Sequence, residues 1–153
     1  HLIGHLQTNK ARVIPGTFDL VHSADSLKLL AALNEAAAKQ QTRIHALLQV
    51  NMSHEEQKSG CEADEAFGLF EQADALPWVQ LDGLMTMAAI VEDPEAVRPV
   101  FARLRDLQQK LLSAGIPKER LRHLSMGMSS DFEVAIEEGA TLVRVGSALF
   151  EGL

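Results

Sequence analysis

The alternation of apolar strand-like runs with helix-like segments is the feature that most constrains the fold of this chain. Six runs have the composition of strands: 2–6, 19–23, 43–51, 79–87 and the runs that lead to Gly127 and to Gly146. Segments with helical periodicity separate these runs, and no pair of runs is joined by a hairpin signal. Parallel strands need long crossovers, usually helical, so the pattern predicts an α/β protein with a parallel sheet.

The helical segments have recognisable start and stop residues. We expect helices over 9–14, 26–41, 63–75 and 94–114 and after Ser130. Ser23 or Asp25 is expected to cap the second of these helices. Pro94 suits the first turn of the fourth, and Gly115 suits its end. Residues 52–61 are expected to form a polar loop.

Two small polar turns follow the last two strands and favour a barrel over an open sheet. The first turn is 127–130, GMSS, and the second is Gly146-Ser147. Barrels commonly bind phosphate in the loops after their last two strands. An open doubly wound sheet usually has a G-x-G-x-x-G turn, which is absent here. We therefore expect a (β/α)8 TIM-type barrel with about six of its eight strands present, the first two lying before His1.

The first turn holds the better candidates for an anion contact. Ser129 is the preferred direct contact, and Gly127 is expected to let the backbone approach a ligand. Ser130 and Glu133 match a capping box, S-D-F-E, so Ser130 is expected to cap the following helix. A capped helix start still offers N–H groups to an anion. Taken alone, the turn 127–130 is more readily explained as the start of a helix than as a ligand-binding site.

Arg144 shifts that balance because it interrupts an apolar strand, Val143-Arg144-Val145-Gly146. An arginine is costly to bury unless it is paired or hydrogen-bonded. One interpretation places it on the outer face, exposed or in an ion pair. The other points it at a ligand near the end of the strand. With Gly146 and Ser147 just beyond it, we favour the second.

Composition limits the class of protein. The chain has 153 residues, which suits a single domain over 1–153, and a net charge of −7, which argues against a nucleic-acid-binding surface. No apolar run is long enough to cross a membrane. Cys61 is the single cysteine, so no internal disulfide is possible and a reducing, cytoplasmic location is expected.

Several motifs together resemble one family. They are HLIGHLQTNK (1–10), LLQVNMSHEEQKSGC (47–61), LSMGMSSDFEVAIEEG (124–139) and VRVGSALF (143–150). In this order they resemble the pyridoxal 5′-phosphate (PLP) homeostasis proteins of the YggS/PROSC type. The resemblance covers essentially the whole chain, and its last two motifs are the most specific.

The resemblance implies a fold, a ligand and a set of binding residues. Members have a single barrel similar to the N-terminal domain of alanine racemase, bind PLP and have no established reaction, and their role is in vitamin B6 homeostasis. Ser129, the backbone around Met128, and Gly146-Ser147 are then expected to hold the cofactor phosphate. Arg144 is expected to face the pyridine nitrogen, and Asn51 to line the pocket.

One departure from the family is important. The family holds PLP through a Schiff base to a lysine on its first strand, and no such motif occurs in this chain. None of the six lysines stands in an apolar strand. We therefore expect the C-terminal three-quarters of the barrel, with PLP bound non-covalently or not at all. The missing segment, or a second copy, is the expected protein partner that covers open sheet edges.

Two enzymatic alternatives stay open beside a non-catalytic PLP protein. A PLP-dependent racemase usually needs a tyrosine base, and the chain has no tyrosine. A barrel enzyme acting on another phosphorylated substrate would use Lys58 or histidines as acid and base. We expect no catalytic turnover.

Overall fold

A computed structural model describes residues 1–53 and 59–150 of the chain. The strands are β1 (Leu20–Ala24), β2 (Ile44–Gln49), β3 (Val79–Met85), β4 (His123–Met128) and β5 (Leu142–Arg144). The α-helices are α1 (Leu27–Gln40), α2 (Ala66–Ala73), α3 (Arg98–Ser113) and α4 (Phe132–Glu137). Short 3-10 turns are η1 (Thr8–Val13), η2 (Pro94–Val97), η3 (Lys118–Arg120) and η4 (Ser147–Leu149).

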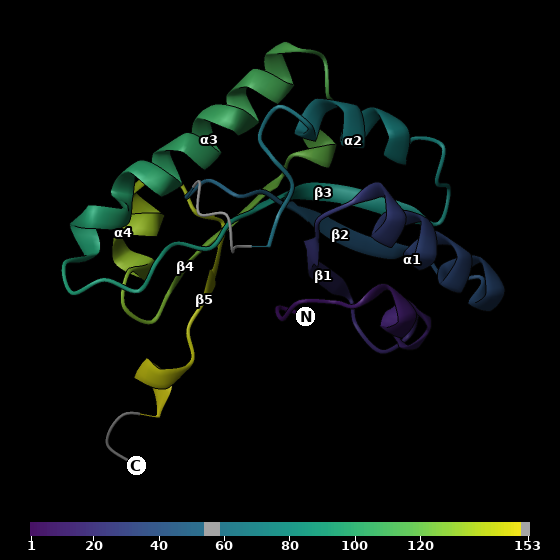
Figure 1. The fold of residues 1–153 in the computed structure, drawn as a ribbon, viewed down its shortest axis with the longest axis horizontal. Helices are drawn as coiled ribbons and strands as arrows, with labels where there is room; N and C mark the ends of the chain where they lie inside the picture. Colours follow the sequence, from purple (N-terminus) through teal and green to yellow (C-terminus); the bar gives the residue numbers. More distant parts are fainter. Residues whose placement is uncertain (54–58, 151–153) are drawn as a thin grey trace.

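The five strands form one parallel sheet in the order β1-β2-β3-β4-β5. Figure 1 shows α1 to α4 arranged along one side of this sheet. Each helix connects one strand to the next, as the alternating sequence pattern predicts. The α/β prediction is therefore confirmed for the described residues. Closure into an eight-stranded barrel stays a prediction.

The expected strand over 2–6 is wrong. Leu2 makes a single isolated bridge to Val21, with its N–H donating to Leu20 O and its C=O accepting from His22 N. Gly4 follows, and glycine weakens strand interiors because it loses the most backbone entropy and packs no side chain. The Ser23 hydroxyl binds the Gly4 carbonyl instead of a ladder partner. The described sheet has five strands, not six.

The expected cap of the second helix is also corrected. β1 extends to Ala24, so Ser23 lies inside a buried strand and cannot cap the helix. Ser26 is the N-cap of α1, and its Oγ accepts a hydrogen bond from Leu29 N at 3.3 Å. Asp25 accepts from the Ser26 hydroxyl and so supports the cap indirectly. The predicted helix over 94–114 begins with the 3-10 turn η2 and continues as α3.

Strand residues divide between two hydrophobic clusters on opposite faces of the sheet. The larger cluster fills the space between the sheet and the helices, and includes Val21, Ala46 and Leu81 with Leu30 and Phe101. The smaller cluster lies on the other face and consists of Leu20, Leu47 and Met85, with Leu142 packed against it. Alternation along each strand produces this division, because successive side chains point to opposite faces.

The sheet is strongly curved toward the smaller cluster. In a flat sheet β1 and β4, which have two strands between them, would lie about 14 Å apart. Nevertheless His22 Nδ1 of β1 lies 2.8 Å from Ser125 Oγ of β4. Two short side chains cannot span a flat sheet at that distance. The described sheet is therefore an arc, concave on the face that carries His22 and Ser125.

A polar cluster occupies the amino-terminal halves of the central strands. The buried carboxylate of Asp82 lies 2.6 Å from His45 Nδ1, and accepts a hydrogen bond from Gln80 Nε2 at 2.8 Å. Arg122 adds an ion pair at 3.2 Å. These partners satisfy Asp82 and explain how a carboxylate is tolerated inside the sheet. Sequence spacing alone did not indicate this cluster.

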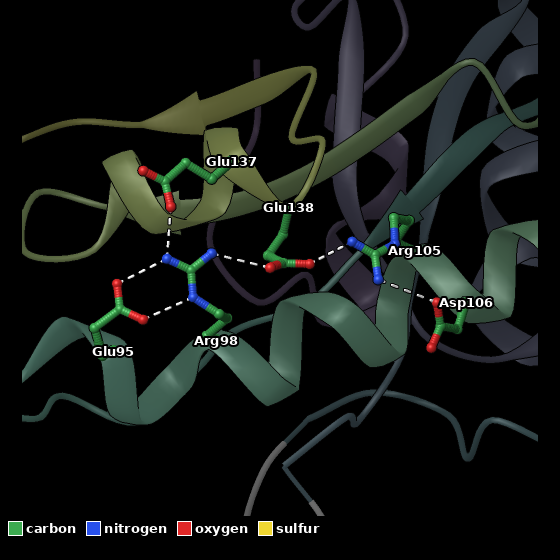
Figure 2. Close-up of polar contacts among 6 residues, drawn as sticks. All are labelled: Glu95, Arg98, Arg105, Asp106, Glu137 and Glu138. Carbon is green, nitrogen blue, oxygen red and sulfur yellow. Dashed lines mark hydrogen bonds and ion pairs between the residues drawn. The ribbon is translucent and has the colours of Figure 1, made fainter.

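Ion pairs tie α4 to α3 (Figure 2). Arg98 binds Glu95, Glu137 and Glu138, and Arg105 also binds Glu138. These carboxylates, Glu95 foremost, raise the pKa of Arg98. The Glu138 side chain is only 12% exposed, whereas that of Glu137 is 63% exposed. The ion pairs hold the end of the helix that follows the Ser129 turn.

Cys61 is expected to react very slowly with thiol reagents. It is buried, and burial, with a smaller contribution from Glu65, raises the pKa of its thiol to about 12. Only the thiolate reacts, and this pKa implies about a thousandfold less thiolate than in an ordinary cysteine. Absorbance at pH 8 with a disulfide reagent should show slow labelling of the folded chain and fast labelling in guanidinium. Equal rates in the two conditions would contradict the buried position.

No helix within the described ranges is both long and apolar enough to cross a membrane.

Candidate functional site

Two adjoining cavities lie at the carboxyl ends of the strands. They have volumes of about 430 and 440 Å³, and Ile3, Ala88, Met128 and Arg144 line both of them. We call the first the Asn51 cavity and the second the Ser129 cavity. All five residues expected from the sequence line the Ser129 cavity: Met128, Ser129, Arg144, Gly146 and Ser147. Asn51, which the family resemblance also places at the pocket, lines the other.

The Ser129 hydroxyl joins the two turns. Its Oγ accepts hydrogen bonds from Gly146 N at 3.0 Å and from Ala148 N at 3.4 Å. Two backbone N–H groups of the second turn therefore point at one oxygen that belongs to the first turn. Backbone N–H groups that converge on one point also favour an anionic oxygen there. The sequence predicts that the turns are neighbours, but not that Ser129 connects them.

The capping box expected at Ser130 is absent. α4 begins at Phe132, and the residue before it, Asp131, makes no side-chain cap. Asp131 Oδ1 instead accepts from Met128 N at 2.6 Å, which closes the turn onto itself. Ser130 is exposed at the surface of the turn. The N–H of Met128 is thus already bonded, and Met128 contributes its partly exposed side chain to the cavities.

Gly127 allows α4 to pack closely on β4. Its φ is +91°, and a Cβ at this position would lie 2.6 Å from the Ala135 Cβ and 3.0 Å from Phe132 Cα. The missing side chain lets the helix pack directly on the end of β4. The expectation that Gly127 also lets the backbone approach a ligand stays a prediction.

Arg144 points into the concave side of the sheet and is only 6% exposed. Its Nη1 donates to Ser125 Oγ at 2.7 Å, and its Nη2 donates to Thr86 O at 3.0 Å. Its Nε is buried without a hydrogen-bond partner in the described structure. Burial lowers the pKa of Arg144, while Asp131 opposes this shift. The outer-face interpretation is excluded.

No carboxylate within residues 1–53 and 59–150 forms an ion pair with Arg144. Burying a cation without an anionic partner costs free energy, so such an arrangement is typical of a site that receives an acceptor or an anion. Arg144 and Gly146 line the same cavity. Together they make a cavity that attracts a ligand with negative charge at one end.

His22 and Ser125 belong to the same site, and sequence reasoning missed both. Ser125 lies between Arg144 and His22, and His22 Nε2 lies 3.1 Å from His1 Nδ1. Burial first, and then the charge of Arg144, lower the pKa of His22 to about 4. No local motif connects two residues that are 103 positions apart. Only the alternation along each strand places their side chains on one face.

The alternative enzyme was expected to use Lys58 or histidines, and of the histidines His5 lines the Asn51 cavity. Lys58, the proposed acid or base of an alternative enzyme, lies outside the described residues. In the part of the chain that the structure describes, no group of three histidine, cysteine or carboxylate side chains is placed to hold a metal ion.

Comparison with known proteins identifies the relatives of the chain. The family model for the alanine racemase N-terminal domain matches residues 1–153. The pyridoxal phosphate homeostasis protein of Aquifex aeolicus is 45% identical over 153 residues, and that of Vibrio cholerae is 41% identical over 150. Each match covers 98% of this chain but only 65% and 62% of these relatives. The chain thus spans slightly less than two thirds of their length.

Solved structures agree with this assignment. PipY of Synechococcus elongatus, solved with PLP bound, is 36% identical with a TM-score of 0.85, over 98% of this chain and 69% of PipY. An alanine racemase of Clostridium difficile shares the fold with a TM-score of 0.79 at 15% identity, over 96% of this chain and 38% of the racemase. The chain therefore belongs to the alanine racemase N-terminal domain family.

Proposed function

We propose that this chain binds PLP without catalytic turnover, as part of a PLP homeostasis protein. One observation carries the proposal. Two backbone N–H groups, of Gly146 and Ala148, converge on Ser129 Oγ, next to a buried arginine that forms no ion pair with a carboxylate of the described residues. A ligand that carries a phosphate dianion on a flat polar ring suits this site, because the N–H groups can bind the phosphate and the arginine can bind the ring. The names of the relatives and the PLP-bound PipY support the choice of PLP among such ligands.

The Ser129 cavity is the proposed phosphate site. Gly146 N and Ala148 N donate to a protein oxygen, Ser129 Oγ, so these N–H groups are placed to donate to an oxygen of a ligand there. The hydroxyls of Ser129 and Ser147 border the same cavity and add donors. Met128 forms part of the wall through its side chain.

Arg144 is the proposed neighbour of the pyridine nitrogen. Its buried Nε–H has no acceptor among the described residues, and an unprotonated ring nitrogen is an acceptor. A guanidinium in that place disfavours a second positive charge on the ring. PLP, when bound to enzymes, supplies an electron sink that depends on ring electronics. Arg144 would weaken that sink, which supports binding without turnover over racemase chemistry.

Binding by this chain is proposed to be non-covalent. No lysine lines either cavity among the described residues. After treatment with PLP and borohydride, mass spectrometry of the chain should show no PLP adduct at the site. The chain should also produce no D-alanine from L-alanine in the presence of PLP, because it has no tyrosine to act as the second base.

The binding test compares the wild-type chain with Arg144→Met and Ser129→Ala. Equilibrium dialysis should show PLP affinity at least tenfold lower in each variant, since each loses a hydrogen-bonding group next to a charge. Arg12→Met is the matched control, because Arg12 borders a different cavity on η1. Circular dichroism verifies that each variant is folded.

Binding measurements with pyridoxal and with inorganic phosphate test the ring site and the phosphate site separately. Pyridoxal should bind more weakly than PLP by at least tenfold, because it lacks the group that the turns hold. Phosphate alone should compete with PLP. No PLP binding by the folded wild-type chain, or equal affinity for pyridoxal and PLP, would sink the proposed function.

A further inference from the structure

We propose that His22 and Ser125 are positioning residues that form a relay to Arg144 and hold its guanidinium in one orientation at the PLP site. The relay connects β1, β4 and β5 across the concave face of the sheet. This inference rests on the proposed function for its ligand, but its geometry is tested without PLP.

The direction of each hydrogen bond follows from the groups involved. A guanidinium has only donors, so at 2.7 Å from Arg144 Nη1 the Ser125 oxygen must accept. Its own hydrogen is then directed at His22 Nδ1, which lies 2.8 Å away. That nitrogen must therefore lack a proton. A neutral His22 carries its hydrogen on Nε2, facing His1 Nδ1 at 3.1 Å.

The surroundings of His22 keep it neutral. Arg144 on β5, the amino group of His1 before β1 and His123 on β4 each disfavour a further positive charge on His22. His22 is 2% exposed, so solvent does not screen these charges. A protonated Nδ1 would no longer accept from Ser125. The unprotonated state is thus the one that supports the relay.

The relay restricts the rotation of Arg144. Because the Ser125 hydroxyl donates its hydrogen to His22, its oxygen stays oriented to accept a hydrogen bond from Arg144 Nη1. Thr86 O holds Nη2 at 3.0 Å, and the Thr86 hydroxyl is itself bonded to Val50 O. Both ends of the guanidinium are therefore fixed, and the Nε edge is the part left for a ligand. Without His22, the serine hydroxyl has no buried acceptor and is free to turn away.

Nitrogen-15 NMR of the apo chain tests the geometry directly. His22 should show an unprotonated Nδ1 and a protonated Nε2 at pH 7. The two Nη groups of Arg144 should give separate signals, because hydrogen bonds at both ends hinder rotation. A protonated Nδ1 on His22, or averaged Nη signals in the wild-type chain, would overturn the relay.

Paired substitutions separate a relay from a merely structural role. His22→Asn keeps an acceptor at the δ1 position and should retain separate Arg144 Nη signals. His22→Phe keeps a similar bulk without an acceptor and should merge them, as should Ser125→Ala. Ser113→Ala, at the exposed end of α3, is the matched control and should change nothing. If His22→Phe and His22→Asn give the same Arg144 spectrum in folded chains, the proposal is wrong.

PLP affinity then connects the relay to function. His22→Phe and Ser125→Ala should bind PLP about tenfold more weakly, and His22→Asn should recover most of the loss. If the wild-type chain has separate Nη signals but binds no PLP, the proposed function fails and the positioning of Arg144 stands. If PLP binds but His22→Phe changes neither the Arg144 signals nor the affinity, the relay fails and the proposed function stands.

Discussion

Replacement of Gly83 by alanine should destabilise this protein by at least about 3 kcal/mol, a large part of the stability of an ordinary domain. A Cβ on Gly83 would lie 2.0 Å from the carbonyl oxygen of His123, far inside van der Waals contact. The neighbouring atom is backbone in β4, so no side chain can rotate away. Relief requires β3 and β4 to separate, which breaks the ladder that positions the Ser125 strand.

Urea unfolding followed by circular dichroism measures this effect. The matched control is Gly68→Ala in α2, where the nearest atom to an added Cβ is the flexible end of Gln72 at 3.6 Å. Alanine in place of glycine inside a helix should stabilise the protein by about 0.5–1 kcal/mol. Opposite signs for the two substitutions are expected. A Gly83→Ala chain with wild-type stability would show that the sheet does not have this close approach.

The second large effect is a loss of stability in mild acid that depends on His22. The pKa of His22 is lowered from 6.5 to about 4 in the folded chain, by burial first and then by the charge of Arg144. Between these two pH values the unfolded chain binds more protons than the folded chain. The contribution of neutral His22 is therefore complete above about pH 6.5 and is lost as the pH falls toward 4, by roughly 3 kcal/mol at most.

Urea titrations at several pH values between 7 and 4 test this expectation. His22→Asn is the reference, because asparagine does not titrate while all the carboxylates remain. The stability of the wild-type chain relative to this variant should decrease steadily through the window. Parallel pH curves for the two chains would show that His22 titrates equally in the folded and unfolded states.

Local residue patterns were sufficient to predict most of the secondary structure. The apolar runs became β1 to β5 and the segments between them became helices, because both kinds of element depend on periodicity within a short window. The failures were also local. Gly4 broke the run at 2–6, and Ser26 rather than Ser23 capped α1 because β1 extends one residue further than expected.

The site was predictable only in part. Met128, Ser129, Arg144, Gly146 and Ser147 were expected from their positions after the last two strands, and all of them border one cavity. Their particular partners were not predictable. Ser130 was expected to cap the following helix, but that cap is absent, and Asp131 instead accepts a hydrogen bond from Met128 N within the turn.

His22 illustrates what no local pattern contains. The residues next to His22 in the sequence have the pattern of an ordinary buried strand. Nothing in that pattern indicates a contact with Ser125 or Arg144. The contact exists because the sheet curves, which brings β1 opposite β4. Curvature results from the twist and packing of all the strands together, so it cannot be deduced from any one segment.

By itself the sequence determined the α/β class, the order of strands and helices, and the placement of two polar turns at neighbouring strand ends, because these depend on residue spacing. The tertiary structure alone decided that Ser129 bridges the turns, that Gly127 receives α4, and that a neutral histidine orients Arg144 through a serine. These contacts join residues that are distant along the chain. The curvature of the sheet brings these residues together. Burial then removes water as a competing hydrogen-bond partner.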